Sequence, residues 1–293
     1  MVVASIIVAL REGVEVALII VIMLAYLKKS QQMELKMYVL SGAVLATITS
    51  VGIAFVMSLI WGTVEGPVLS VFEGVVVLIA ALLLTTMVVW MQKVGPQITE
   101  EIESSMKERT DLRNASGLLL LSFALVLREG VELVFFTFAL AIENGLSTYL
   151  GVALGLVISG VVGIGVYQGS LRISLKSFFK WTSFLLIVFA AGMIAYGIHE
   201  LQEAGLLLIG PLEIWDINPP LLPDGSYPLF HENGIIGSIA KSLLGYNGNP
   251  SGLEVVAYAS YLILMTSYYA RNSISNTRNE REKTSRLMPR ITS

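Results

Sequence analysis

The pentapeptide Arg-Glu-Gly-Val-Glu occurs twice in this sequence, at residues 11–15 and 128–132, each time inside a long apolar run. On a helix, residues three and four positions apart lie on one face. Glu12 and Glu15 therefore present two carboxylates to one point, and Arg11 can pair with Glu15 one turn on. The second copy repeats this arrangement with Arg128, Glu129 and Glu132. Paired carboxylates beside a guanidinium in an apolar segment indicate a cation site.

Other ionisable residues also lie in apolar runs. His199, Glu200 and Glu203 form a His-Glu-x-x-Glu pattern at the end of one run. In total the runs hold seven carboxylates: Glu12, Glu15, Glu73, Glu129, Glu132, Glu200 and Glu203. Against the two arginines they leave five negative charges if all are ionised, and each charge at a membrane helix centre costs roughly 2.5–3.5 kcal/mol. Ion pairs that only lock helices together leave this excess unexplained, so protons or a metal cation must visit the site.

The ligand types restrict which cation this is. Carboxylate oxygens suit hard ions such as Mg²⁺, Ca²⁺, Mn²⁺ and ferric iron, whereas copper(I) takes sulfur ligands. The chain has no cysteine, and methionines in the apolar runs are scattered singly. An intramembrane zinc hydrolase built on His199 and Glu200 is an alternative, but the zinc protease motif needs histidine at both ends.

Composition places these residues in a membrane. Of the 293 residues 55% are hydrophobic and 14% charged, and the mean hydropathy is +0.74. A soluble domain is nearer a quarter charged, and the net charge of −3 without a basic face argues against a nucleic-acid partner. Since a span takes about 20 apolar residues, the sequence predicts an all-α polytopic membrane protein. Its seven transmembrane helices are expected near 2–27, 38–60, 68–91, 116–142, 148–168, 181–204 and 252–270.

Charge in the connecting segments predicts the orientation. Sixteen of the nineteen basic residues lie in segments that seven spans place on one side. The positive-inside rule therefore puts the N-terminus outside and the C-terminus in the cytoplasm. The first and fourth spans then run in opposite directions, so the two motifs belong to two inverted three-helix repeats. Transporters built this way hold their substrate near the midplane, where the repeats meet.

The chain is expected to divide into a first three-helix repeat, a cytoplasmic linker, a second three-helix repeat, an extracytoplasmic segment, a seventh transmembrane helix and a cytoplasmic tail. The corresponding ranges are 1–92, 93–115, 116–204, 205–251, 252–270 and 271–293. The linker is expected to form a short solvated helix. Glycines in the fifth span indicate close packing between the repeats or between copies of the chain.

The extracytoplasmic segment contains Pro219, Pro220, Pro223 and Pro228, which exclude a helix in its first half. An apolar stripe over 234–245 predicts a helix, either lying on the outer surface or re-entering as a lid over the pathway. Acidic residues outnumber the single lysine on this side, and most are expected to be solvated loop charges: Glu65, Glu213, Asp216, Asp224, Glu232 and Glu254.

The two Arg-Glu-Gly-x-Glu motifs, with His-Glu-x-x-Glu ending the sixth span, resemble those of the oxidase-dependent iron permease family, in its bacterial branch. The resemblance covers nearly the whole chain. It implies high-affinity uptake of ferric iron across the plasma membrane (in bacteria the inner membrane) by a protein that is not an enzyme and has no resident cofactor. It also implies that the motif glutamates carry transport, beside an extracytoplasmic iron-oxidising or iron-delivering partner. These glutamates are Glu12, Glu15, Glu129 and Glu132.

The residues and the resemblance together predict two stations for the metal. Glu73, His199, Glu200 and Glu203 lie toward the outer ends of the third and sixth spans and would form the first station. The four motif glutamates would form the second, near the midplane, supported by Arg11 and Arg128. A proton-coupled exchanger or importer of divalent cations (Mn, Zn, Pb), using the same carboxylates, is the alternative.

Overall fold

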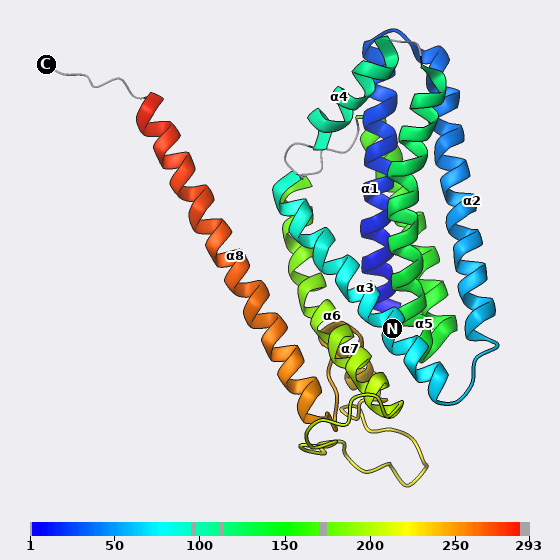
Figure 1. Cartoon of the computed structure of the whole chain (residues 1–293), viewed down its shortest axis with the longest axis vertical. Helices are drawn as coiled ribbons and strands as arrows, with labels where there is room; N and C mark the ends of the chain where they lie inside the picture. Colours follow the sequence, from blue (N-terminus) through cyan, green and yellow to red (C-terminus); the bar gives the residue numbers. More distant parts are fainter. Residues whose placement is uncertain (1, 95–97, 112–113, 170–174, 288–293) are drawn as a thin grey trace, which may run out of the picture.

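The computed structural model describes residues 2–94, 98–111, 114–169 and 175–287, which are helical or irregular and contain no strand (Figure 1). The expected linker and tail thus extend into residues 95–97, 112–113 and 288–293, which lie outside the described residues. A 3₁₀ turn (Met33–Leu35) precedes the second helix. The helices are α1 (Val2–Lys29), α2 (Lys36–Trp61), α3 (Pro67–Val94), α4 (Ile98–Asp111), α5 (Ala115–Tyr167), α6 (Leu175–Glu203), α7 (Ile235–Leu244) and α8 (Gly252–Leu287).

Helix α5 differs from the expectation of two separate spans, because Ala115–Tyr167 forms one continuous helical element of 53 residues. The helix nevertheless reverses direction. The Thr148 hydroxyl donates to the carbonyl of Leu140, eight residues earlier, at 3.0 Å, whereas eight residues of a straight helix rise about 12 Å. Its two halves therefore form a tight hairpin.

Within the described residues, four helical segments are long and apolar enough to cross a membrane: Met33–Trp61, Pro67–Met91, Gly145–Tyr167 and Trp181–Glu203. The first and fourth expected spans lie in α1 and the first half of α5, and each carries the three charges of a motif. Helix α8 begins as expected but continues to Leu287, well past residue 270. These features are those of an all-helical membrane protein.

Helix α1 packs between the two halves of α5. It runs antiparallel to the first half, since Ala4 and Val8 share a core with Phe136 and Leu140. It runs parallel to the second half, because Gly151 lies against Ser5 and Gly163 against Ala17. Helix α2 packs on the outside of the same hairpin (Figure 1).

The packing around the two motifs is reciprocal. The motif glycine Gly13 in α1 contacts the side chain of Ser159 in the second half of α5. The motif glycine Gly130 in the first half of α5 contacts the side chain of Ser50 in α2. Neither glycine has room for a Cβ, so the neighbouring helices approach closely. This is the reciprocity expected of two related halves.

Helices α3 and α6 cross antiparallel as a second pair. Gly74 and Gly197 face one another, with each backbone carbonyl within 3.2 Å of where a Cβ on the other would stand. The crossing continues through small, fully buried residues, Ala80 and Ala81 on α3 and Ala190 and Ala191 on α6. The α3–α6 pair stands beside the α1–α2–α5 bundle, and α8 packs against α6 (Figure 1).

The two short helices α4 and α7 lie at opposite ends of the bundle. Helix α4 confirms a helix in the linker, and it also buries one face, because Ile102 and Met106 pack with α1. Helix α7 ends at Gly245, whose left-handed backbone (φ 69°) touches Gly192 of α6. Gly192 lies eleven residues before the end of α6, about 16 Å along its axis. The end of α7 therefore lies alongside α6 rather than beyond its last turn.

Candidate metal centre

The first motif is completely enclosed. The side chains of Arg11, Glu12 and Glu15 are 0%, 1% and 3% exposed. The Arg11 guanidinium lies 3.5 Å from Glu12 through Nη1 and 3.3 Å from Glu15 through Nε, and Nη1 also donates to the sulfur of Met87 at 2.7 Å. The expected pairing four residues along the helix is therefore present, with α3 closing over it.

The second motif has the same internal pairing in a more open setting. Arg128 Nε lies 3.1 Å from a carboxylate oxygen of Glu132, but its side chain is 39% exposed. Its guanidinium stacks on the ring of Trp90, with Cζ 4.3 Å from the ring centroid. Glu129 is buried and points away from this pair toward α1.

The two motifs meet at three carboxylates. Glu12, Glu15 and Glu129 each offer an oxygen within 4.8 Å of the other two, and no other triad of acidic or histidine residues among the described residues does so. The second oxygens of Glu12 and Glu129 are buried without a hydrogen-bond donor in the described part of the chain, as is one oxygen of Glu132. Buried carboxylate oxygens without donors are costly unless a cation sits between them. The cluster can hold a hard or borderline cation.

Apolar layers separate this cluster from both ends of the bundle. Toward the end that carries 205–251, Phe136 follows Glu132 by one helical turn, is fully buried, and packs with Val8 and Leu140. Toward the other end, Ile19 follows Glu15 by one turn and packs with Met23, Leu118 and their neighbours. The two layers occupy the same position relative to their motifs.

The residues expected to form an outer station are divided between two places. Glu73 accepts a hydrogen bond from the indole of Trp61 at 2.7 Å. Glu200 on α6 packs beside Gly74, the residue that follows Glu73 in α3. His199 faces instead toward α8, where its Nδ1 lies 3.0 Å from Glu254. Glu203 is exposed. The four side chains are not gathered at one point.

Comparison with known proteins decides the class of this site. Residues 2–275 match the iron permease FTR1 family. The chain belongs to that family. Proteins named ferrous iron permease EfeU from Escherichia coli O157:H7 and Shigella sonnei are each 34% identical over 257 residues, which is 87% of this chain and 90% of the relative. The one from Yersinia pestis is 31% identical over 256 residues, 86% of this chain and 88% of the relative. No solved structure matches the chain.

This FTR1-family chain is thus an integral membrane permease for iron, as the resemblance predicted. Membership of this family makes the chain a transporter.

One polar residue of this permease was not expected in a site. Glu254 was grouped with solvated loop charges, yet it is 2% exposed in the first turn of α8. Ser251 and Glu254 form a reciprocal capping box, in which each backbone N–H donates to the other side chain, at 3.1 and 3.2 Å. The spacing Ser-x-x-Glu before an apolar run was the signal that identifies this helix start.

The other outer carboxylates mostly bind their own loops. Asp216 accepts from the backbone N–H of Asn218. Asp224 accepts from the hydroxyl and the backbone N–H of Ser226, and these hydrogen bonds hold the pKa of Asp224 below its usual range. These two residues therefore agree with the expectation of solvated loop charges.

Proposed function

We propose that this permease imports iron through the carboxylate cluster of Glu12, Glu15 and Glu129, with Glu132 as a fourth ligand that leaves Arg128 during transport. The observation that carries the proposal is that carboxylates from both motifs approach within 4.8 Å in a buried, apolar setting. Membership of an iron permease family supports iron as the ion. Glu73 and Glu200 would guide the ion toward this cluster from the outer side.

The charge balance supports ferrous iron as the transported form. The two motifs hold four carboxylates and two guanidiniums, so full ionisation leaves two negative charges, which one divalent ion neutralises. The relatives are also named ferrous iron permeases. Ferric iron, expected from the resemblance, would leave one positive charge in a desolvated site. It is the second candidate, and it requires one further ionised carboxylate such as Glu200.

The proposed setting is a plasma membrane, the inner membrane in bacteria. Seven spans, with α5 contributing two, would place the N-terminus outside and the C-terminus in the cytoplasm. The α3–α6 pair would then move against the α1–α2–α5 bundle, opening the layer at Phe136 and the layer at Ile19 in turn. An iron-delivering or iron-oxidising protein would dock where 205–251 lies.

The test is iron uptake by purified protein in liposomes, with ferrous ascorbate and ferric citrate supplied separately. Wild type is compared with the Glu129→Gln, Glu132→Gln double variant, and with Glu65→Gln as a control at an exposed carboxylate. We expect ferrous uptake that the double variant loses and the control keeps. Ferric uptake alone would favour the second candidate, and uptake that survives in the double variant would refute the cluster.

Uptake of Mn²⁺ or Zn²⁺ driven by a proton gradient, with no iron flux, would instead establish the divalent exchanger. The same carboxylates would then serve another cation, and the proposed selectivity for iron would be wrong.

A further inference from the structure

A cavity opens between α6, α7 and α8 at the end of the bundle that carries 205–251. Its volume is about 840 Å³ including the open mouth. Six charged or titratable side chains line it: Tyr196, His199, Glu232, Lys241, Tyr246 and Glu254. Its floor is apolar and includes Leu140 and Phe189, which belong to the layer above the carboxylate cluster. The cavity therefore ends where the closed part of the proposed pathway begins.

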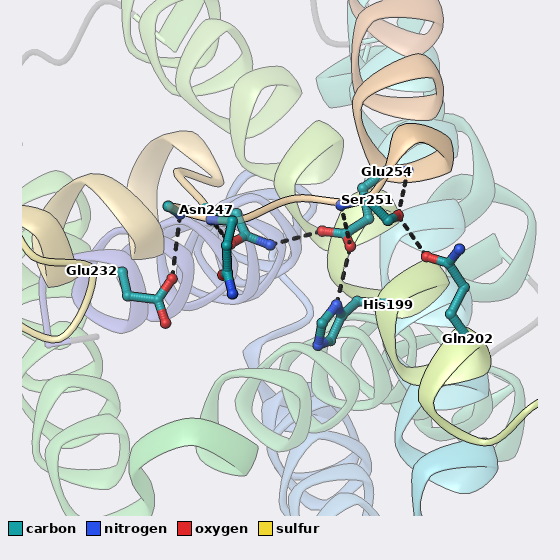
Figure 2. A network of polar contacts seen from close by, with 8 residues as sticks. His199, Gln202, Glu232, Asn247, Ser251 and Glu254 are labelled. Carbon is teal, nitrogen blue, oxygen red and sulfur yellow. Dashed lines mark hydrogen bonds and ion pairs between the residues drawn. The ribbon is translucent and has the colours of Figure 1, made fainter. Parts of the chain in front are cut away.

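His199 stands on the wall of this cavity in one defined orientation (Figure 2). Its Nδ1 lies 3.0 Å from a carboxylate oxygen of Glu254. A carboxylate only accepts hydrogen bonds, so Nδ1 carries a proton, and in the neutral imidazole Nε2 keeps the lone pair. The imidazole is 45% exposed, although its partner is 3% exposed. A pair that served only to join α6 to α8 would have no need for an exposed ring.

Glu254 is held rigidly enough to fix the imidazole. One of its oxygens accepts from the backbone N–H of Ser251 at 3.1 Å as well as from His199, and the other accepts from the Asn247 amide at 2.8 Å. Ser251 is in turn bound by its hydroxyl to Gln202 at 2.6 Å. With its oxygens occupied by donors, Glu254 acts through His199 rather than as a ligand. Metal-binding histidines are commonly oriented by such a carboxylate.

A second carboxylate, Glu232, lines the same cavity. Figure 2 shows it accepting a hydrogen bond from the backbone N–H of Gly248 at 3.3 Å. The backbone of Glu232 is fixed by its N–H, which donates to Asn218 at 3.1 Å. A neutral imidazole nitrogen and a carboxylate that share a cavity are ligands for borderline divalent metals.

From this geometry we infer that the cavity is an entry site for a divalent transition metal, with His199 Nε2 as a ligand, Glu254 as the positioning residue, and Glu232 as a second carboxylate that draws the ion into the cavity. The inference rests on the proposed function for its place in the path. The imidazole favours ferrous iron, cobalt and zinc over Ca²⁺ and Mg²⁺, which take oxygen ligands. This assignment replaces an outer station in which His199 acts together with Glu200.

The two histidines of the chain, His199 and His231, make a direct test practical. The full chain is purified with ¹⁵N-labelled histidine, and imidazole nitrogen resonances are followed by NMR while Zn²⁺, a diamagnetic probe, is added. Before metal we expect His199 in the Nδ1–H tautomer. With Zn²⁺, its Nε2 resonance should shift while Nδ1 stays protonated and His231 stays unmoved.

Matched variants separate ligation from structure. His199→Asn keeps an amide donor near the Nδ1 position but removes the ligand at Nε2, so this Zn²⁺ site should be lost while the fold is kept. Glu254→Gln should weaken Zn²⁺ binding by about 10–100-fold, as loss of an orienting partner does. Glu232→Gln should weaken it as well. An unshifted Nε2 at saturating Zn²⁺, or unchanged affinity in Glu254→Gln, would overturn the inference.

The same titration on the Glu129→Gln, Glu132→Gln double variant distinguishes this inference from the proposed function. The His199 shift should persist there although transport is lost. A His199 shift in wild-type protein that shows no iron flux would support the entry site and refute the proposed path. Iron flux in wild-type protein without a His199 shift would support the proposed path and refute the entry site.

Discussion

The two copies of Arg-Glu-Gly-Val-Glu are identical in sequence and differ in their surroundings. Both make the arginine–glutamate pair four residues along the helix, at 3.3 Å in α1 and 3.1 Å in α5. Arg11 is fully buried against Met87, whereas Arg128 is 39% exposed over Trp90. Local sequence thus determines the pair, and the partner helix determines its environment.

The carboxylates show the same asymmetry. Both glutamates of the first motif contribute to the cluster, but only Glu129 of the second does, while Glu132 stays with Arg128. In both motifs the arginine contacts α3, through Met87 and Trp90, so a single helix touches both halves of the site. Movement of α3 would therefore change the two motifs together, and an inward-facing and an outward-facing form would exchange their environments.

The largest difference between the motifs should appear when each arginine is removed. Arg11→Met leaves Glu12 and Glu15 buried without their cation, and loss of one partner of a buried pair costs about 3–5 kcal/mol. Arg128→Met leaves one buried carboxylate, Glu132, without its partly exposed cation, and should cost less, about 1–3 kcal/mol. Free energies of unfolding in detergent measure both. Equal losses would show that the environments do not differ in solution.

The apolar layers one turn beyond each motif provide the next comparison. Truncating buried phenylalanine or isoleucine to alanine costs about 3–5 or 2–5 kcal/mol, so Phe136→Ala and Ile19→Ala should both destabilise the fold. The two truncations should open the carboxylate cluster to water from opposite ends of the bundle. Since the chain has no native cysteine, a thiol at Glu132→Cys reports access alone.

In vesicles with the 205–251 side facing out, an impermeant thiol reagent should modify Glu132→Cys faster when Phe136→Ala is added, and not when Ile19→Ala is added. Ala139→Cys, which lines the cavity, serves as the accessible control. Equal acceleration by both truncations would mean that the two layers do not divide the path as proposed.

Replacing the motif glycines by alanine should lower the unfolding free energy by a smaller amount, and by more at Gly13 than at Gly130. A Cβ at Gly13 would stand 2.7 Å from the Ser159 Cβ, and one at Gly130 would stand 3.0 Å from the Ser50 Cβ. Overpacking of this kind costs about 1–3 kcal/mol, so Gly13→Ala should lose more unfolding free energy than Gly130→Ala. Ser159→Gly should restore the first and Ser50→Gly the second. Failure of both rescues would place the clash elsewhere.

Much of the site was predictable from spacing, because helical periodicity alone brings Arg11 to Glu15 and Arg128 to Glu132. The same periodicity shows why the outer station is divided: adjacent residues on a helix point about 100° apart, so His199 and Glu200 face different neighbours. The unequal burial of the arginines was not predictable, because it depends on Met87 and Trp90, which reach the motifs only through tertiary packing. Seven spans, the orientation and the metal ligands stay predictions.

The smallest expected effect tests whether α3 distinguishes the motifs as the structure indicates. Trp90→Leu removes the aromatic face beneath Arg128 and keeps an apolar side chain, and a cation–π contact at a partly exposed site is worth about 0.5–1 kcal/mol. A double-mutant cycle of Trp90→Leu with Arg128→Met should return a coupling of that size. The cycle with Arg11→Met, its matched control, should return a smaller one, because the contact of Arg11 with α3 is to Met87. Stronger coupling of Trp90 to Arg11 than to Arg128 would contradict the contacts of this structure. A different conformation, in which Trp90 contacts the first motif, would then predominate in detergent.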